Sequence, residues 1–279
     1  MVRAITTIVC SLLLLLSFSC SLEDTGPQET IPDSGIVTFT AMTGQGETRS
    51  SQEGSFETGD AIGVFAIEPK TGVYWAVNNK YTYDGQKFKP EAEADNIIVT
   101  VGTDFDFYVY YPFKAGQTDI TGISHTAGNQ SDKPGWLSAD FMTATYTDPI
   151  RNYTVPLHFK HRMSTVEVRI DRNDGVREAT MENVRRTSRF NLLTGGITTD
   201  ESRGSCTMHK YSETGGTTVF RVTIPAQRLT TSSNYVALTG TTGIKLRGTS
   251  DMVTEEGKIH NYRMDYKKQI TIPVSYTHL

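Results

Sequence analysis

Two pairs of side chains have spacings that could support metal binding or acid–base chemistry. His158 and His161 form a His-x-x-His motif, but residues i and i+3 of a continuous strand point to opposite faces, so chelation would need a bend. No third ligand stands nearby in the sequence. Asp104 and Asp106 share a strand face about 7 Å apart, a separation compatible with two-carboxylate hydrolysis. We interpret all four as ordinary strand residues and predict no metal, no cofactor and no catalytic residue.

Other candidate chemistry is sparse. The chain has no Gly-x-Ser-x-Gly, Walker or zincin motif. Cys206 could pair with a histidine as a nucleophile, although a buried structural thiol is the commoner fate. Four arginines form the one basic concentration, with acids between them, so we interpret it as a solvated face and keep an anionic glycan patch as the alternative. They are Arg177, Arg185, Arg186 and Arg189.

Cys20 is a candidate for lipid modification. Arg3 and an apolar run over residues 8–16 precede it, and this run is shorter than the roughly 20 residues of a spanning helix. Residues 1–19 are therefore predicted to be a signal peptide. The small residues before Cys20 resemble a bacterial lipobox, with Ser17 where an aliphatic residue is usual. Cys20 is predicted to carry diacylglycerol and palmitate, and an ordinary secretory signal is the alternative.

Arg49 draws its meaning from its position. A tether (residues 20–35) and a short isolated strand (residues 36–42) precede a polar Gly- and Ser-rich segment that ends at the Gly59-Asp60 turn. A protease that cuts after Arg49 would remove everything before the main fold without entering it. We predict a processing site at Arg49, and one exposed loop arginine is the alternative.

Composition and periodicity indicate an all-β chain. The 279 residues carry a formal net charge of −4, which argues against nucleic acid as a partner. Short runs with period-two alternation recur between Gly-containing turns, and no long run has helical spacing. Strand candidates include residues 61–67 and 105–111, and the second is expected to be central because aromatic residues occupy both of its faces. A polar loop is expected over residues 114–135. The apolar positions change parity between the runs over residues 153–159 and 166–170, which predicts a bulge or bend near residues 161–164. Asp148-Pro149 is the best internal boundary, which predicts β-sandwich domains over residues 36–149 and 150–272. Residues 273–279 resemble a translated sequencing adapter, so we expect a non-native tail.

Seven short motifs, in this order, are similar to the fimbrillin family of Bacteroidia, which includes the type V pilins. They are Thr48-Arg49, Phe56-x-x-Gly59-Asp60-x-Ile62-Gly63-Val64-Phe65, Tyr111-Pro112, Ala139-Asp140-Phe141-Met142-x-Ala144, Leu157-x-Phe159-x-His161-Arg162-Met163, Phe190-Asn191-Leu192-x-Thr194-Gly195 and Ile224-Pro225. The resemblance covers roughly residues 36–272.

The resemblance implies two tandem transthyretin-like β-sandwich domains and assembly into a pilus. It implies cleavage after Arg49, loss of the strand over residues 36–42, and filling of the resulting groove by a strand of the next subunit. The acids Glu23 and Asp24 resemble a surface-export signal, which implies lipid anchoring on the outer face of the outer membrane. The partners expected are other pilus subunits and surface glycans or proteins.

Our reading is a non-enzymatic, surface-exposed fimbrillin-like subunit or adhesin. One rival is a monomeric, lipid-anchored glycan-binding protein in which aromatic-rich surface strands and Trp136 stack on sugars. The second rival is a secreted hydrolase that uses Asp104 and Asp106.

Overall fold

The computed structural model describes residues 34–43, 56–171, 176–240 and 244–271. Their regular secondary structure is almost entirely β-strand, and the exceptions are one short α-helix, α1 (Lys133–Ser138), and one 3-10 turn, Glu93–Asp95. The all-β prediction is therefore confirmed.

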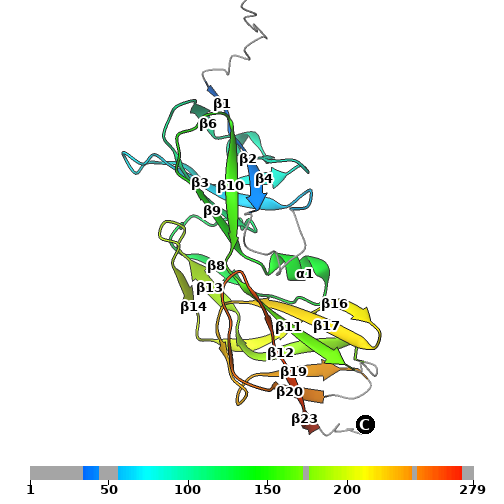
Figure 1. Cartoon of the computed structure of the whole chain (residues 1–279). Coiled ribbons are helices and arrows are strands. Elements are labelled where there is room, and N and C mark those ends of the chain that lie inside the picture. Colours follow the sequence, from blue (N-terminus) through cyan, green and yellow to red (C-terminus); the bar gives the residue numbers. More distant parts are fainter. Residues whose placement is uncertain (1–33, 44–55, 172–175, 241–243, 272–279) are drawn as a thin grey trace, which may run out of the picture. The chain divides into compact units, whose positions relative to one another are not determined.

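The first group of strands closes into a barrel (Figure 1). Its neighbours around the ring are β10 (Thr154–His161), β2 (Thr38–Thr43), β5 (Phe88–Pro90), β4 (Tyr74–Tyr83), β3 (Ala61–Ile67), β7 (Asp106–Tyr111) and β9 (Met142–Tyr146). A small two-stranded sheet pairs β1 (Ser34–Ile36) with β6 (Ile98–Thr100). The strand expected over residues 36–42 is thus split between β1 and β2.

The second group forms two main sheets. One has the order β16 (His209–Thr214), β17 (Thr217–Ile224), β11 (Ser164–Asp171) and β22 (Ile259–Asn261). The other has the order β15 (Arg203–Thr207), β12 (Glu178–Arg185), β19 (Tyr235–Thr239), β20 (Ile244–Gly248) and β23 (Met264–Thr271). Apolar residues of both sheets share one buried cluster, as in a β-sandwich. Smaller sheets join β14 (Ile197–Thr199), β13 (Thr187–Phe190) and β8 (Ile123–Thr126), and β18 (Arg228–Leu229) with β21 (Met252–Val253).

The two groups have separate buried clusters, and β3 contributes to both. Ile62 and Val64 point into the barrel cluster, whereas Phe65 belongs to the cluster of the second group. Period-two alternation places successive side chains on opposite faces, which is why this strand is apolar at nearly every position. β7 does the same with Val109 and Tyr110, so its prediction as a central strand with aromatic residues on both faces is confirmed.

The chain passes from one group to the other between β10 and β11. Leu157 packs in the barrel and Val166 in the second cluster, and the predicted change of parity falls at residues 162–163 between these strands. The bend predicted near residues 161–164 is therefore confirmed. β10 begins after Pro149 but pairs with β2, so it belongs to the barrel. The domain limits 36–149 and 150–272 stay a prediction.

Candidate functional site

Two of the predicted site residues, Cys20 and Arg49, lie outside the described residues. In the sequence, Arg49 stands between the end of β2 at Thr43 and the start of β3 at Ala61. Lipidation and processing therefore stay predictions.

Trp136, the predicted sugar contact, lies on α1 with only 1% of its surface exposed. Its indole stacks on the His209 ring, with 5.0 Å between centroids. The helix begins at Asp132, whose carboxylate accepts a hydrogen bond from the Gly135 N–H, so local capping turns Trp136 inward. This burial counts against a surface stacking role for Trp136, because a ligand would first have to displace its cover.

The structure separates the histidine pair. His161 bonds through Nδ1 to the carboxylate of Asp140, which is 3% exposed, while His158 lies exposed on β10. The carboxylates of Asp104 and Asp106 have different surroundings. Asp104 forms an ion pair with Lys70 at 3.4 Å. Burial raises the pKa of Asp106. Within the described ranges, no group of three or more metal-ligating side chains gathers.

Cys206 is a buried thiol, as its commoner fate predicts. It is 1% exposed, and its Sγ donates to the Ala127 carbonyl at 3.5 Å. Burial raises its pKa to about 11, which suppresses the reactive thiolate.

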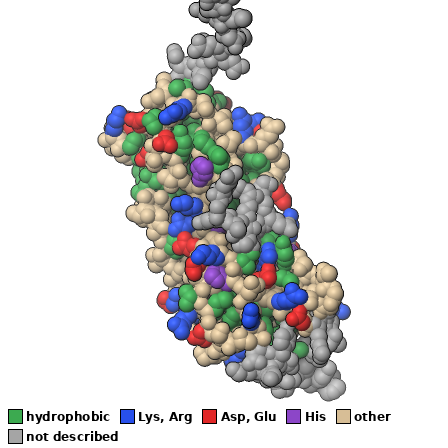
Figure 2. Space-filling model, viewed as in Figure 1, with side chains coloured by type: hydrophobic (Ala, Val, Ile, Leu, Met, Phe, Trp, Pro, Cys, Tyr) green, Lys and Arg blue, Asp and Glu red, His purple; other side chains and the backbone are tan. Residues whose placement is uncertain are grey.

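Acids pair with part of the arginine cluster. Arg185 contacts Glu201 at 2.6 Å, and Arg189 lies 4.0 Å from Asp200. On the face drawn in Figure 2, the coloured Lys and Arg side chains are likewise scattered among Asp and Glu. The cluster is therefore diluted by acids, in line with a solvated face.

β2 fills a gap in the barrel between β10 and β5. It runs parallel to β10 over six register pairs, Thr38↔Thr154 to Thr43↔Phe159, and meets β5 at the pair Phe39↔Phe88. Phe39 is fully buried and packs edge-on against Tyr81 and Phe107 at 5.1 and 5.3 Å between ring centroids. β2 is thus a short N-terminal strand that completes a core built by the rest of the chain.

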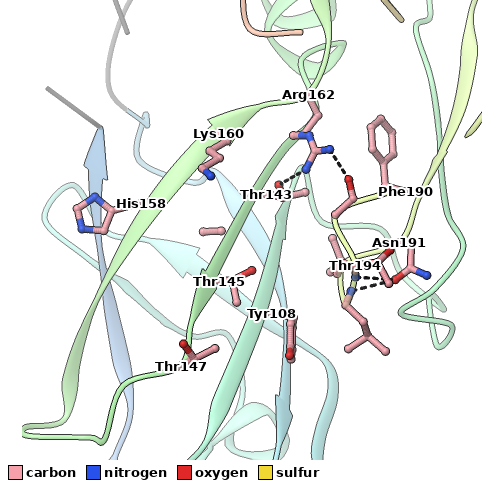
Figure 3. A pocket seen from close by; sticks show the side chains of 14 residues that line it. Tyr108, Thr143, Thr145, Thr147, His158, Lys160, Arg162, Phe190, Asn191 and Thr194 are labelled. Atoms are coloured by element: carbon pink, nitrogen blue, oxygen red, sulfur yellow. Dashed lines mark hydrogen bonds between the residues drawn. The ribbon is translucent and has the colours of Figure 1, made fainter. Parts of the chain in front are cut away.

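A pocket of about 590 Å³ lies where β9 and β10 separate (Figure 3). These strands pair only at Lys160↔Thr143 and His161↔Met142 within the described chain. Beyond these pairs β9 stays bonded to β7 and β10 to β2. Pro156 in β10 has no N–H to offer a neighbour, which suits a strand left unpaired on one side. The opening follows from this divergence.

Arg162 fixes the opposite wall of the pocket, residues 190–195, against the sheet. Its guanidinium donates to the Thr143 hydroxyl at 3.3 Å, the Gly195 carbonyl at 2.7 Å and the Glu256 carboxylate at 3.0 Å. The Asn191 side chain caps this wall by accepting from the backbone N–H groups of residues 193 and 194. Figure 3 shows Lys160 and Thr143 beside Arg162 and Tyr108 at the far end.

Polar donors dominate the pocket lining. Hydroxyl groups come from Tyr108 and several threonines, cationic groups from Lys160 and Arg162, and an imidazole from His158. None of the described lining residues is acidic, although Asp106 stands next to the pocket and hydrogen-bonds Tyr108. Burial and this carboxylate raise the pKa of Tyr108, which therefore remains a neutral donor. Sequence reasoning missed this site because its walls come from distant segments.

Sequence reasoning expected aromatic residues on surface strands but did not single out the exposed pair on β4. Trp75 is 58% exposed and Tyr74 45%, and the Trp75 ring leans on Phe105 at 5.5 Å between centroids. Both residues follow the β3–β4 turn. Two adjacent aromatic residues at the start of a strand were the sequence signal for this surface.

Among the residues that the structure describes, no helix is long and apolar enough to cross a membrane.

Solved structures of three Bacteroides proteins share this fold. A candidate cell adhesion protein from Bacteroides ovatus superposes with a TM-score of 0.63 at 16% identity, covering 85% of this chain and 96% of its own. A candidate cell adhesion protein from Bacteroides uniformis gives a TM-score of 0.60 at 16% identity, with coverage of 85% and 96%. A third from Bacteroides thetaiotaomicron gives 0.53 at 16% identity, with coverage of 84% and 94%. At these identities the likeness concerns the fold.

No curated protein matches the sequence significantly. The family model described as fimbrillin-like matches residues 48–277, which is most of the chain, and so confirms the resemblance carried by the motifs. The chain belongs to the fimbrillin-like family.

Proposed function

We propose that the chain is a surface-exposed, lipid-anchored subunit or adhesin of a pilus, assembled by protease-triggered strand exchange. Membership of the fimbrillin-like family supports a place in a fimbrium. The position of β2 supports the strand-exchange mechanism. β2 is an N-terminal strand that forms part of the barrel wall, and Arg49 follows it in the sequence.

Cleavage after Arg49 would leave β2 attached to the barrel by noncovalent contacts alone. Its departure would open the barrel and expose unpaired N–H and C=O groups along β10, together with the cavity that held Phe39. Such an edge is costly to leave open, so a strand from another subunit would be stabilised there. The chain itself performs no covalent chemistry in this scheme.

The test is limited digestion with an Arg-specific protease. We expect one early cut that releases a fragment ending at Arg49, followed by ladders of assembled product on a denaturing gel. Arg49→Ala should abolish both. Arg151→Ala is the matched control, because Arg151 is exposed in a loop and its loss should leave the early cut unchanged. A full-length monomer that persists after digestion, or the same early cut in Arg49→Ala, would contradict the scheme.

Anchoring is tested separately by fractionation. Cys20→Ala should move the protein from the membrane fraction to the soluble fraction, because the diacylglycerol attachment point is gone. Ser19→Ala retains the thiol and serves as the control. Continued membrane association of Cys20→Ala would count against lipidation.

Exposed aromatic side chains favour a second candidate function, that of a monomeric glycan-binding surface protein. Trp75, 58% exposed, offers the stacking surface that Trp136 does not. This alternative predicts saturable glycan binding without cleavage, weakened in Trp75→Ala and retained in Arg49→Ala. Cleavage-dependent ladders with no glycan binding would exclude it.

A further inference from the structure

The pocket between β9, β10 and residues 190–195 has no role in the strand exchange proposed above. Among the lining residues that the structure describes, none belongs to β2. Its volume of about 590 Å³ lies within the range of sites for small ligands. The pocket is therefore large enough to hold a small ligand.

The charged residues of the lining favour an anionic ligand. Lys160 and Arg162 both line the pocket, and the part of the lining that the structure describes contains no acidic residue. The Arg162 charge is already shared with Glu256, whereas the Lys160 ammonium has no ion pair among the described residues. An anionic group that enters beside Lys160 would gain a charge-assisted hydrogen bond and would be close to the guanidinium as well.

The hydroxyl groups of the lining favour a sugar as the ligand. Thr145 and Thr147 lie on the β9 side, and Tyr108 lies across from Thr145 on β7. A hydroxyl is both donor and acceptor, which matches the hydroxyl groups of a sugar. Leu193, 41% exposed, adds an apolar surface against which the C–H face of a sugar ring can pack. A peptide strand would need an extended groove, whereas β9 and β10 close together again at Lys160↔Thr143.

We propose that this pocket binds a carboxylate-bearing sugar, with the carboxylate beside Lys160 and the ring hydroxyls on Thr145 and Tyr108. Arg162 acts as a positioning residue, since its bonds to Thr143 and Gly195 set the distance between the two walls. The inference deepens the adhesin part of the proposed function by naming a ligand class. It requires neither cleavage nor polymerisation.

Binding is measured on the intact, uncleaved protein by saturation-transfer NMR and calorimetry. The probes are tri-galacturonic acid with its methyl ester, and 3′-sialyllactose with lactose, so that uronate and sialate sources are distinguished. We expect at least one acidic sugar to bind saturably, about tenfold or more tightly than its neutral counterpart. Lys160→Gln should weaken that binding about tenfold, and Thr145→Val should weaken it several-fold.

Lys87→Gln is the matched control, because it removes the same charge from the turn before β5 and should leave affinity unchanged. Unfolding temperatures equal to that of wild type would show that these substitutions leave the fold intact. The proposal is overturned if neither acidic sugar binds with a Kd below about 10 mM. It is also overturned if the neutral counterparts bind equally, if Lys160→Gln behaves like Lys87→Gln, or if a Glu/Asp hexapeptide binds more tightly than both sugars. None of these failures affects the protease test of assembly.

Discussion

Phe39→Ala tests whether β2 completes the barrel core before assembly and leaves it afterwards. The ring of Phe39 is fully buried and packs edge-on against Tyr81 and Phe107. Truncation of a buried phenylalanine costs about 3–5 kcal/mol of unfolding free energy. Within that figure, each lost aromatic pair accounts for about 0.5–1.5 kcal/mol. We therefore expect the uncleaved variant to be about 3–5 kcal/mol less stable than wild type.

The assay is urea unfolding followed by fluorescence, performed on the precursor and again on the assembled product. Met42→Ala is the control, because Met42 lies on the same strand with 48% of its surface exposed, and its loss should cost less than about 1 kcal/mol. In the assembled product Phe39→Ala and wild type should be equally stable, since residue 39 departs with the fragment. Cleaved Phe39→Ala should also assemble faster, because its β2 is held less tightly.

Two results would refute this reasoning. If Phe39→Ala costs no more than Met42→Ala, β2 does not contribute to the barrel core. If the variant destabilises the assembled product as much as the precursor, β2 remains in place and strand exchange is wrong.

Three further predictions probe the packing that supports the site. Gly63→Ala should destabilise by about 1–3 kcal/mol in a urea titration, because a Cβ there would meet the Tyr110 ring at 2.2 Å, while Gly128→Ala, with no atom within 4 Å, should stay within about 0.5 kcal/mol. Tyr110→Phe should cost about 1–3 kcal/mol, since the hydroxyl accepts from the Lys114 N–H at 3.1 Å; an unchanged midpoint would contradict this bond. In a Cys10→Ser/Cys20→Ser background, Cys206 should react with Ellman's reagent at pH 8 about 100-fold more slowly in native than in unfolded protein, because burial raises its pKa from 9.0 to about 11. The unfolded thiol ionises first, so this group's contribution to stability is lost as pH rises from about 9 to about 11, and equal native and unfolded rates would show an accessible thiol.

Local periodicity was sufficient for most strands because each side chain's face is set by its neighbours. The run over residues 61–67 was predicted with the bounds that β3 has, and its apolar character on both faces follows from two adjacent cores. Period and polarity are properties of consecutive residues, so they can be read from the sequence. The change of parity between Phe159 and Val166 was readable for the same reason.

The elements that were missed depend on contacts between distant segments or on a cap. Residues 114–135 were expected as a polar loop, yet β8 forms there because β13 pairs with it over Thr187↔Thr126 to Phe190↔Ile123. α1 begins at Asp132, whose side chain caps the helix, and Pro134 stands in its first turn. A search for alternating polarity does not detect such a capping signal. Trp136 was taken as a surface residue for that reason.

The pocket lay beyond sequence reasoning. It requires the divergence of β9 from β10, together with Arg162 reaching Gly195 across residues far apart in the chain. Thr145 by itself is an ordinary exposed position of a strand. The chemistry of the site arises when register places these side chains on one face.

The pairing of β2 also constrains the strand that would replace it. Six register pairs join β2 to β10 and one joins it to β5, so most of the backbone bonding is on the β10 side. A replacing strand must therefore compete along β10 and run parallel to it. Val37 and Phe39 are fully buried and alternate with exposed or half-exposed neighbours, so the same strand must bring an aliphatic and an aromatic side chain two residues apart. A donor peptide with alanine at the aromatic position should then fail to displace β2 from the cleaved protein, whereas one with phenylalanine there should succeed. Equal displacement by the two peptides would show that backbone pairing alone selects the partner.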